Sequence, residues 1–215
     1  MRRSFDPEIL DSDAITDEVA ERAHRHLLRT HKLLGNIRSL VHCVRRDPLP
    51  IRRVLDVGCG HGGILLQVQR QLGVEAVGVD LKPPARLNRP FPILQADAAR
   101  DPLPEADVAI CVCLAHHLPE DELIELIRNV GRSCRRFVIL DLVRNRVPLT
   151  LFKTFAPLFV SRLNVADGCQ SIRRSYTPEE LRAAIGRALS GTRGRFQHSV
   201  APLSIRQIAD ISYYC

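Results

Sequence analysis

A glycine-rich segment, Gly58–Gly63, follows a short apolar run, Val54–Val57, and precedes a stretch whose apolar residues recur at helical spacing. Glycine lets the backbone approach a bound nucleotide closely, because no side chain stands between them. The segment satisfies the Gly-x-Gly-x-x-Gly pattern in the strand–loop–helix context that gives this pattern its meaning. The sequence therefore predicts a nucleotide-cofactor loop. The loop alone does not identify the cofactor, and a nicotinamide-dependent oxidoreductase is one candidate.

Carboxylates come where the neighbouring strands should end. Asp56 lies two residues before Gly58, Asp80 ends the next apolar run twenty residues after Gly60, and Asp97 closes the run after that. A carboxylate at the position of Asp80 can accept hydrogen bonds from both hydroxyls of a ribose. Open α/β sheets bind ligands at the carboxyl ends of their strands. We therefore expect these carboxylates to share one edge of a sheet with the glycine loop.

The elements that must position these residues alternate between strand and helix. Helical stripes are expected over Ile64–Leu72 and Leu123–Val130. The expected strands are Val54–Val57, Ala76–Val79, Pro92–Gln95, Asp107–Leu114 and Phe137–Leu142. Strand, crossover helix and strand in series form parallel sheets. The predicted fold class is therefore α/β, with a Rossmann-like, doubly wound, mostly parallel sheet.

Helical segments flank this alternation on both sides. Apolar residues between Asp13 and Val44 recur in steps typical of an amphipathic helix, either one helix or two helices broken near Gly35. After the fifth strand, residues 143–175 are predicted to form a helical insertion, with helix over Val147–Leu163 after Pro148. Thr177 should cap a further helix. The segments expected to close the sheet as an antiparallel pair are Phe196–Val200 and Ile205–Ser212.

Length and composition describe an ordinary globular chain, with 215 residues of which 45% are hydrophobic and 26% charged. The predicted division is an N-terminal helical extension over 1–50 and one cofactor-binding domain over 51–215. No apolar run approaches the roughly 18 residues of a membrane span, and the N-terminus lacks the apolar core of a secretory signal. We therefore expect a cytoplasmic protein. The seven cysteines include no Cys-x-x-Cys pair, so neither a zinc ribbon nor a disulfide framework is indicated.

The formal net charge is +7, from 31 Lys and Arg against 24 Asp and Glu. Positive charge of this size can attract nucleic acid, an anionic membrane surface or an acidic substrate. The basic residues are spread along the chain, however, and the chain has no Trp and only 5% aromatic residues. A stacking platform for single strands is therefore not indicated, and nucleic acid is not the expected partner.

The segment Val54–Gly62 resembles the first motif of class I S-adenosylmethionine-dependent methyltransferases. Asp80 resembles the ribose-binding acid of that family, and Asp97-Ala98 its adenine-contacting pair. Cys113–Leu118 resembles the strand end and following turn of the small-molecule branch. These elements follow one another in the order and spacing of the family over about Ile51–Leu142.

By this resemblance the cofactor is S-adenosylmethionine and the product is S-adenosylhomocysteine (SAH). Asp56 and the backbone of Gly58–Gly60 would hold the methionine part, and Asp80 would hold the ribose hydroxyls. The full cofactor-binding set that the resemblance implies is Asp56, Gly58, Cys59, Gly60, Asp80, Leu81, Asp97, Ala98 and Leu114.

Methyl transfer from a sulfonium needs an aligned nucleophile and a dry site more than it needs protein acid–base chemistry. His116, after the fourth strand, can serve as a general base near neutral pH. The resemblance leaves the alternative open, because a His-His turn at this position also occurs in the family without a catalytic role. Asp141 and Tyr176 are further candidates, for orienting the acceptor.

No metal site is predicted. The histidines of the N-terminal helical region do not share a ligand spacing, and a solvated helix face is the expected account of them; they are His24, His26 and His31.

The preferred hypothesis is an enzyme of secondary metabolism that methylates oxygen or carbon of a small aromatic, quinone or polyketide-like acceptor, as a monomer or homodimer. The apolar run Val147–Leu163 and a loose likeness of Arg173–Leu181 to methyltransferases of quinone and polyketide pathways favour it. An RNA or protein methyltransferase is the first alternative, although Ala115–Leu118 replaces the Asn/Asp-Pro-Pro-Tyr/Phe motif of base-modifying relatives. A nicotinamide-dependent oxidoreductase is the second alternative, although the chain lacks a recognisable Tyr-x-x-x-Lys catalytic pair. The last alternative is a cofactor-binding partner subunit without catalysis.

Overall fold

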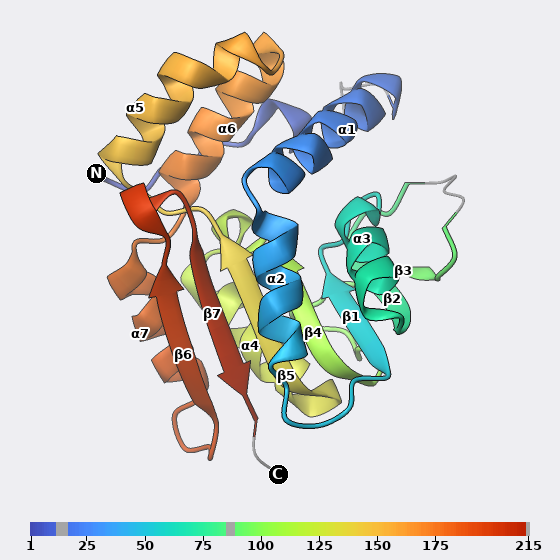
Figure 1. Ribbon diagram of the computed structural model, residues 1–215. Helices are drawn as coiled ribbons and strands as arrows, with labels where there is room; N and C mark the ends of the chain where they lie inside the picture. The colour runs from blue at the N-terminus through green and yellow to red at the C-terminus, as the bar shows by residue number, and fades with distance from the viewer. Residues whose placement is uncertain (12–16, 85–88, 214–215) are drawn as a thin grey trace.

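The computed structural model describes residues 1–11, 17–84 and 89–213. In these ranges the chain forms one seven-stranded sheet with helices on both faces (Figure 1). The strand order is β3-β2-β1-β4-β5-β7-β6, parallel from β3 to β5, with β7 antiparallel to both of its neighbours. The order reverses between β1 and β4, which lie side by side at the centre. Such a switch point is where doubly wound sheets bind ligands.

Each strand predicted from an apolar run is present. The strands are β1 (Arg53–Val57), β2 (Glu75–Asp80), β3 (Ile93–Gln95), β4 (Ala106–Val112), β5 (Cys134–Asp141), β6 (Arg195–Val200) and β7 (Gln207–Ser212). The predicted antiparallel closing pair is therefore confirmed. The fourth strand ends before Leu114, because Cys113 adopts a left-handed conformation with φ +55° and turns the chain into a short 3-10 helix.

Helices cover both faces of the sheet and one end of it. The helices are α1 (Asp17–Leu33), α2 (Asn36–Arg45), α3 (Gly63–Leu72), α4 (Glu120–Ser133), α5 (Arg146–Phe155), α6 (Arg162–Arg174) and α7 (Pro178–Ala188), with 3-10 turns η1 (Ile9–Asp11), η2 (Ala115–His117), η3 (Ala156–Leu158) and η4 (Pro202–Ser204). Figure 1 shows α1, α5 and α6 beyond the carboxyl ends of the parallel strands. The predicted ligand edge is therefore the end of the sheet that these helices overlie.

The core consists of an apolar layer on each face of the sheet. Successive side chains of a strand point to opposite faces, so Val54 packs with α2 and α3 while Leu55 packs with α4 and α7. Both side chains are fully buried, as is Phe137 of β5. Burial on both faces explains why the central strands are continuous apolar runs.

The N-terminal helical region is two helices rather than one. Gly35 separates α1 from α2 with φ +69°, a left-handed conformation that favours glycine. The cap at Thr177 is also confirmed. Its hydroxyl accepts from the Glu180 amide while the Glu180 carboxylate accepts from the Thr177 amide, which is a complete capping box.

The insertion after β5 is broken rather than continuous. The expected helix over Val147–Leu163 is instead α5, the turn η3, and α6, and α5 starts before Pro148 because the Asn145 side chain caps it by accepting from the Val147 amide. Pro157 interrupts the helix, since it lacks an amide donor, and Ser161 then caps α6.

Candidate active site

The glycine loop after β1 is held in shape by contacts with β2. The amides of Gly58 and Cys59 donate to the Val79 carbonyl oxygen at 2.8 and 3.1 Å. Gly58 and Gly60 have φ values of +72° and +49°, which lie in the left-handed region that favours glycine. The Gly60 amide donates to Asp80 Oδ2 at 2.7 Å. The glycine loop and Asp80, which were expected to share one edge of the sheet, are therefore in direct contact.

The loop has no room for side chains where it meets the neighbouring strand ends. A Cβ on Gly58 would lie 2.7 Å from Leu114 Cδ2, just after β4. A Cβ on Gly78 of β2 would lie 2.6 Å from Cys59 Sγ. Distances this short are below ordinary van der Waals contact. The predicted cofactor residues of β1, β2 and β4 thus form one packed cradle.

Asp56 is a buried carboxylate beside this cradle. It is only 2% exposed, and no described residue donates a hydrogen bond to its side chain. Burial, with the nearby negative charge of Asp80, raises the pKa of Asp56 well above its ordinary value. A buried carboxylate in this state is stabilised by any cation that reaches it.

The remaining predicted cofactor residues follow β2 and β3. Asp80 Oδ1 accepts from the Lys82 amide at 2.9 Å, and Leu81 is 62% exposed. Asp97 Oδ1 accepts from the Ala99 amide at 2.9 Å. Each carboxylate oxygen keeps a second lone pair, so both acids can still accept from a ligand. Residues 80, 81, 97 and 98 all lie at the carboxyl end of the sheet.

Helix α1 covers the outer side of the glycine loop. The ring of His24 lies on that of His61 with their centroids 4.1 Å apart, and a Cβ on Gly60 would lie 3.5 Å from His24 Nε2. The expected solvated face is therefore wrong. His24, His26 and His31 are all half-buried, because α1 packs against the loop and α2 instead of projecting into water.

His31 is held neutral by its surroundings. Burial lowers the pKa of His31 to about 4, against the opposing pull of the Asp141 carboxylate. Arg206 donates to Asn36 Oδ1 at 2.9 Å, which turns the Asn36 amide nitrogen toward His31 Nδ1 at 2.9 Å. Because an amide nitrogen only donates, Nδ1 must be the unprotonated acceptor of this contact.

The turn after β4 carries a buried histidine–carboxylate pair. His116 Nδ1 lies 2.7 Å from Asp141 Oδ1 at the end of β5, and the His116 amide donates to Asp141 Oδ2 at 2.9 Å. Both residues are 3% exposed. On the other side of the ring, His116 Nε2 lies 3.4 Å from Glu8 Oε1. The imidazole is therefore enclosed between two carboxylates.

These carboxylates decide the charge of His116. Burial alone would lower the pKa of His116, but Asp141 and Glu8 outweigh it and raise the pKa to about 9. The ring therefore carries a proton at neutral pH and has both nitrogens engaged. A general base needs an available lone pair, so this geometry does not support His116 as the base, and Asp141 acts on His116 instead of facing an acceptor.

Glu8 also belongs to the site, although no sequence motif points to it. It is 9% exposed, and the Ser171 hydroxyl of α6 donates to Glu8 Oε1 at 2.8 Å. Although burial opposes it, the neighbouring His116, His117 and Ser171 hold the pKa of Glu8 below its ordinary value. A single glutamate far from the motif region carries no pattern in the sequence, so only the fold reveals its role.

The N-terminal segment, residues 3–10, is anchored across η2 and α6. The amides of Ile9 and Leu10 donate to the two carboxylate oxygens of Asp167 at 2.8 and 3.0 Å. Arg3 donates to the Leu118 carbonyl oxygen at 2.8 Å, and the Ser4 amide donates to a carbonyl oxygen of α6 at 3.1 Å. The segment is therefore an integral part of this end of the molecule.

Tyr176 lies under this segment. It is 3% exposed, its hydroxyl donates to the Leu118 carbonyl oxygen at 2.8 Å, and the Arg3 guanidinium lies 3.8 Å from the centre of its ring. With hydroxyl and ring both occupied, Tyr176 is a packing residue in this structure, and its expected role in orienting an acceptor is not supported.

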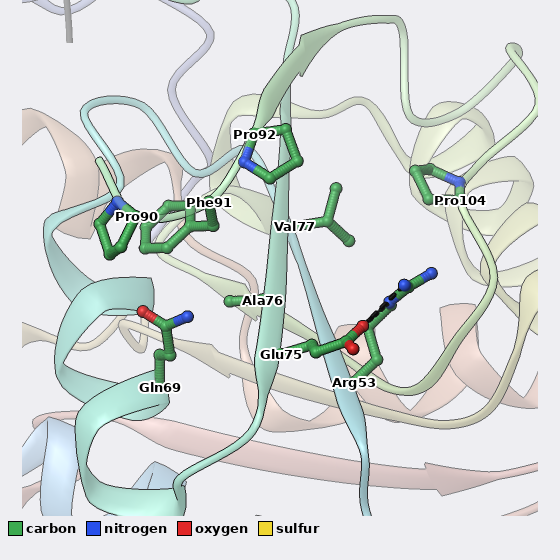
Figure 2. A pocket seen from close by; sticks show the side chains of 9 residues that line it. All are labelled: Arg53, Gln69, Glu75, Ala76, Val77, Pro90, Phe91, Pro92 and Pro104. Atoms are coloured by element: carbon green, nitrogen blue, oxygen red, sulfur yellow. Dashed lines mark hydrogen bonds and ion pairs between the residues drawn. The ribbon is translucent and has the colours of Figure 1, made fainter. Parts of the chain in front are cut away.

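A surface depression of about 330 Å³ lies elsewhere, beside the amino-terminal ends of β1 and β2 (Figure 2). The ion pair between Arg53 and Glu75 lines one side of it, with 2.7 Å between Arg53 Nη2 and Glu75 Oε2. Its lining residues are Arg53, Gln69, Glu75, Ala76, Val77, Pro90, Phe91, Pro92 and Pro104. It contains no residue of the predicted site and lies at the opposite end of the strands.

Comparison with known proteins gives a domain and a fold. Residues 54–136 match the family model described as a methyltransferase domain. No curated protein matches the chain by sequence. Of the helices in the described ranges, none combines the length and apolar character that crossing a bilayer requires.

Solved structures share the architecture over nearly the whole chain. The plantazolicin methyltransferase BpumL, in complex with a monoazolic desmethylPZN analog and SAH, aligns with a TM-score of 0.72 at 12% identity, over 93% of this chain and 91% of that chain. Human N-acetylserotonin methyltransferase in complex with SAM gives 0.62 at 17% identity, over 100% and 63%. Magnesium protoporphyrin IX methyltransferase from Synechocystis PCC 6803 with bound SAH gives 0.54 at 19% identity, over 95% and 91%.

The chain has the Rossmann-like architecture of class I methyltransferases, with the glycine loop at the switch point and the acids at the strand ends. Residues 54–136 form its methyltransferase domain, and enzymes of this class depend on S-adenosylmethionine. The fold class expected from the sequence is therefore confirmed, and so is the expected enzyme class, a methyltransferase, which sets the nicotinamide-dependent alternative aside.

Proposed function

We propose that the chain binds S-adenosylmethionine in the cradle around the glycine loop and methylates a small-molecule acceptor. The observation that carries the proposal is Asp56, a carboxylate 2% exposed at the end of β1 that receives no hydrogen bond from a described residue. The methionine part of the cofactor carries an ammonium group. Such a cation beside Asp56 would stabilise its ionised form.

The other assignments follow the strand ends. Asp80 would accept from the ribose hydroxyls with the lone pairs that Gly60 and Lys82 leave available. Asp97 and Ala98 would contact the adenine. The adjoining Cys59 backbone, Leu81 and Leu114 complete the proposed set.

When bound, the cofactor supplies a methyl group on a positively charged sulfur. The chain's task is to bind it, align the acceptor with the methyl carbon and exclude water. Both ring nitrogens of His116 face carboxylates, so this residue holds the turn after β4 together with Asp141 and does not take up the acceptor's proton. The proposal therefore assigns no protein general base.

The acceptor proposed is an aromatic, quinone or polyketide-like molecule, methylated on oxygen or carbon. The helices α5 and α6 lie beyond the carboxyl ends of the parallel strands, where they can cover an apolar acceptor (Figure 1). The similar structures are named for plantazolicin, N-acetylserotonin and magnesium protoporphyrin IX, which supports a small or natural-product acceptor.

A labelled-methyl screen tests the proposal. The chain is incubated with S-adenosylmethionine labelled on the methyl group and, in parallel, with phenols, quinols, enolic diketones, total RNA and a mixed protein extract. We expect label in one of the small-molecule sets, and about 10-fold less there with Asp80→Ala when the cofactor is well below saturation. Label found only in RNA or protein would contradict the proposal and favour the alternative that the +7 charge prompts.

Other expectations stay predictions. They are the cytoplasmic location, the monomeric or homodimeric state, the absence of a nucleic-acid partner, and the division into an extension over 1–50 and a domain over 51–215 with its insertion at 143–175.

A further inference from the structure

We propose that Glu8, His116 and His117 form a binding site for a divalent transition-metal ion of the zinc type. This site goes beyond the proposed methyl transfer, and metal binding can be measured without turnover. Its members come from two distant parts of the chain, the N-terminal segment and the turn η2. No metal site is predicted from the sequence, in which Glu8 lies far from His116 and His117.

The potential ligand atoms converge at nearly the spacing of a bound site. Glu8 Oε1 lies 3.4 Å from His116 Nε2 and 3.8 Å from His117 Nε2. One ligand atom from each residue lies within 4.8 Å of the other two. Ligand atoms that are each about 2.1 Å from a tetrahedral ion lie about 3.4 Å from one another. Little movement is therefore needed to bring these atoms onto one ion.

The surrounding residues already orient both histidines of this group. Asp141 lies 2.7 Å from His116 Nδ1 and so directs Nε2 toward Glu8. A carboxylate behind the far ring nitrogen is the usual support of a metal-binding histidine, because it fixes the ring and the tautomer. The ring of His117 packs on that of His116, with centroids 4.3 Å apart, which limits its rotation.

The carboxylate is equally well fixed. The Ser171 hydroxyl donates to Glu8 Oε1 at 2.8 Å, and Asp167 accepts from the amides of Ile9 and Leu10 immediately after Glu8. Glu8 is 9% exposed and His116 is 3% exposed. These groups are therefore held inside the molecule, unlike the acidic clusters that form by chance on surfaces.

The two imidazoles and one carboxylate indicate which metal ions the site would bind. Imidazole nitrogens with one carboxylate suit Zn²⁺, Co²⁺ or Fe²⁺, whereas Mg²⁺ and Ca²⁺ prefer oxygen ligands throughout. A set of one carboxylate and two histidines leaves a coordination position open, as catalytic rather than structural zinc sites do. On the proposed function, that position would bind an acceptor oxygen, since η2 directly follows Leu114, which packs on the cofactor loop.

Cobalt is the probe, because its absorption spectrum reports its ligands. The full chain, freed of metal, is titrated with Co²⁺ at pH 8, and Zn²⁺ is then added in competition. We expect one Co²⁺ per chain, visible absorption bands of a nitrogen–oxygen site without the near-ultraviolet band of a cysteine thiolate, and displacement by Zn²⁺ but not by Mg²⁺. His117→Ala and Glu8→Gln should each weaken Co²⁺ binding about 100-fold, and the exposed control His42→Ala should leave it unchanged.

The proposal is overturned if the folded wild type takes up no stoichiometric Co²⁺, or if His117→Ala and Glu8→Gln bind it as the wild type does. The cluster is then an ion-pair network in which a proton occupies the place assigned to the metal. Circular dichroism shows that each variant is folded. Asp80→Ala should retain Co²⁺ binding, so failure of the metal site is distinguishable from failure of the cofactor site.

Discussion

The cofactor edge and the N-terminal edge of this molecule are built in different ways. The cofactor edge comes from one continuous stretch, β1 to β4, with each proposed contact at the end of a strand. The N-terminal edge comes from residues 3–10, the turn η2, the end of β5 and helix α6, which meet only in the folded chain. The first can be recognised from local spacing, and the second only from the fold.

The two edges also differ in their electrostatics. At the cofactor edge Asp56 is a buried carboxylate without a donor among the described residues, and Asp80 adds to its negative potential. At the N-terminal edge the imidazolium of His116 is already enclosed by Asp141 and Glu8. One edge therefore holds a buried carboxylate without a donor among the described residues, whereas two carboxylates of the other edge face the same histidine ring.

A substitution in the glycine loop should have the largest effect, confined to the cofactor edge. In Gly58→Val a side chain would meet Leu114, and valine would be strained at φ +72°. We expect affinity for S-adenosylmethionine to fall by more than about 100-fold, or about 2.7 kcal/mol, in calorimetry. The control Gly186→Ala, where the space is open, should bind normally. Near-normal binding by Gly58→Val would mean that the loop is not the cofactor site.

The neutral His31 predicts a pH dependence of stability. Its folded pKa of about 4 lies below the ordinary value of 6.5, so the unfolded chain takes up the proton first as pH falls. The contribution of His31 is therefore complete above pH 6.5 and is lost as pH falls toward 4, by about 3 kcal/mol. The free energy of unfolding, measured with urea between pH 4 and 6.5, should depend less on pH in His31→Gln than in wild type. In the exposed control His42→Gln its pH dependence should equal that of wild type. Equal slopes in all three would show that His31 is not buried as a neutral ring.

Loosening the N-terminal segment should separate the two edges. Asp167→Ala removes the acceptors of the Ile9 and Leu10 amides, at a cost of about 1–2 kcal/mol. We expect faster hydrogen exchange over residues 1–11, measured by mass spectrometry, with cofactor affinity changed less than about 3-fold. The exposed control Glu105→Ala should alter neither. A large loss of cofactor affinity would show that the two edges are one site.

The smallest effect is expected at the cap of helix α7, where Thr177 bonds only within its own helix start. Thr177→Ala removes the capping box of α7 and should lower the free energy of unfolding by about 1 kcal/mol. Cofactor affinity and the exchange of residues 1–11 should not change. A shift in either would show that α7 transmits strain to the ligand edge.

Most of the fold could be predicted, because the apolar runs and glycine signals act over short stretches. Such signals predict the strands, the Thr177 cap and the position of Asp80 at the same sheet edge as the glycine loop. Errors arose where a local signal competed with packing. The histidines of α1 read as solvated because periodicity cannot show that the helix rests on a loop.

The N-terminal edge could not be predicted, for a physical reason. Its contacts join residues far apart in the chain, such as Glu8 with His116 and Arg3 with Tyr176. Neither Glu8 nor Arg3 belongs to a motif. The same long-range enclosure explains why His116, whose residue type predicts a base near neutral pH, instead has both ring nitrogens facing carboxylates.

The central claim is tested most directly by calorimetric titration with S-adenosylmethionine and SAH, on wild type, Asp80→Ala and the exposed control Asp121→Ala. The account predicts binding of both ligands by wild type and by Asp121→Ala, and at least about 10-fold weaker binding by Asp80→Ala, as expected for the loss of a charge-assisted hydrogen bond. Absence of binding by a folded wild type, or equal affinity in Asp80→Ala, would contradict it.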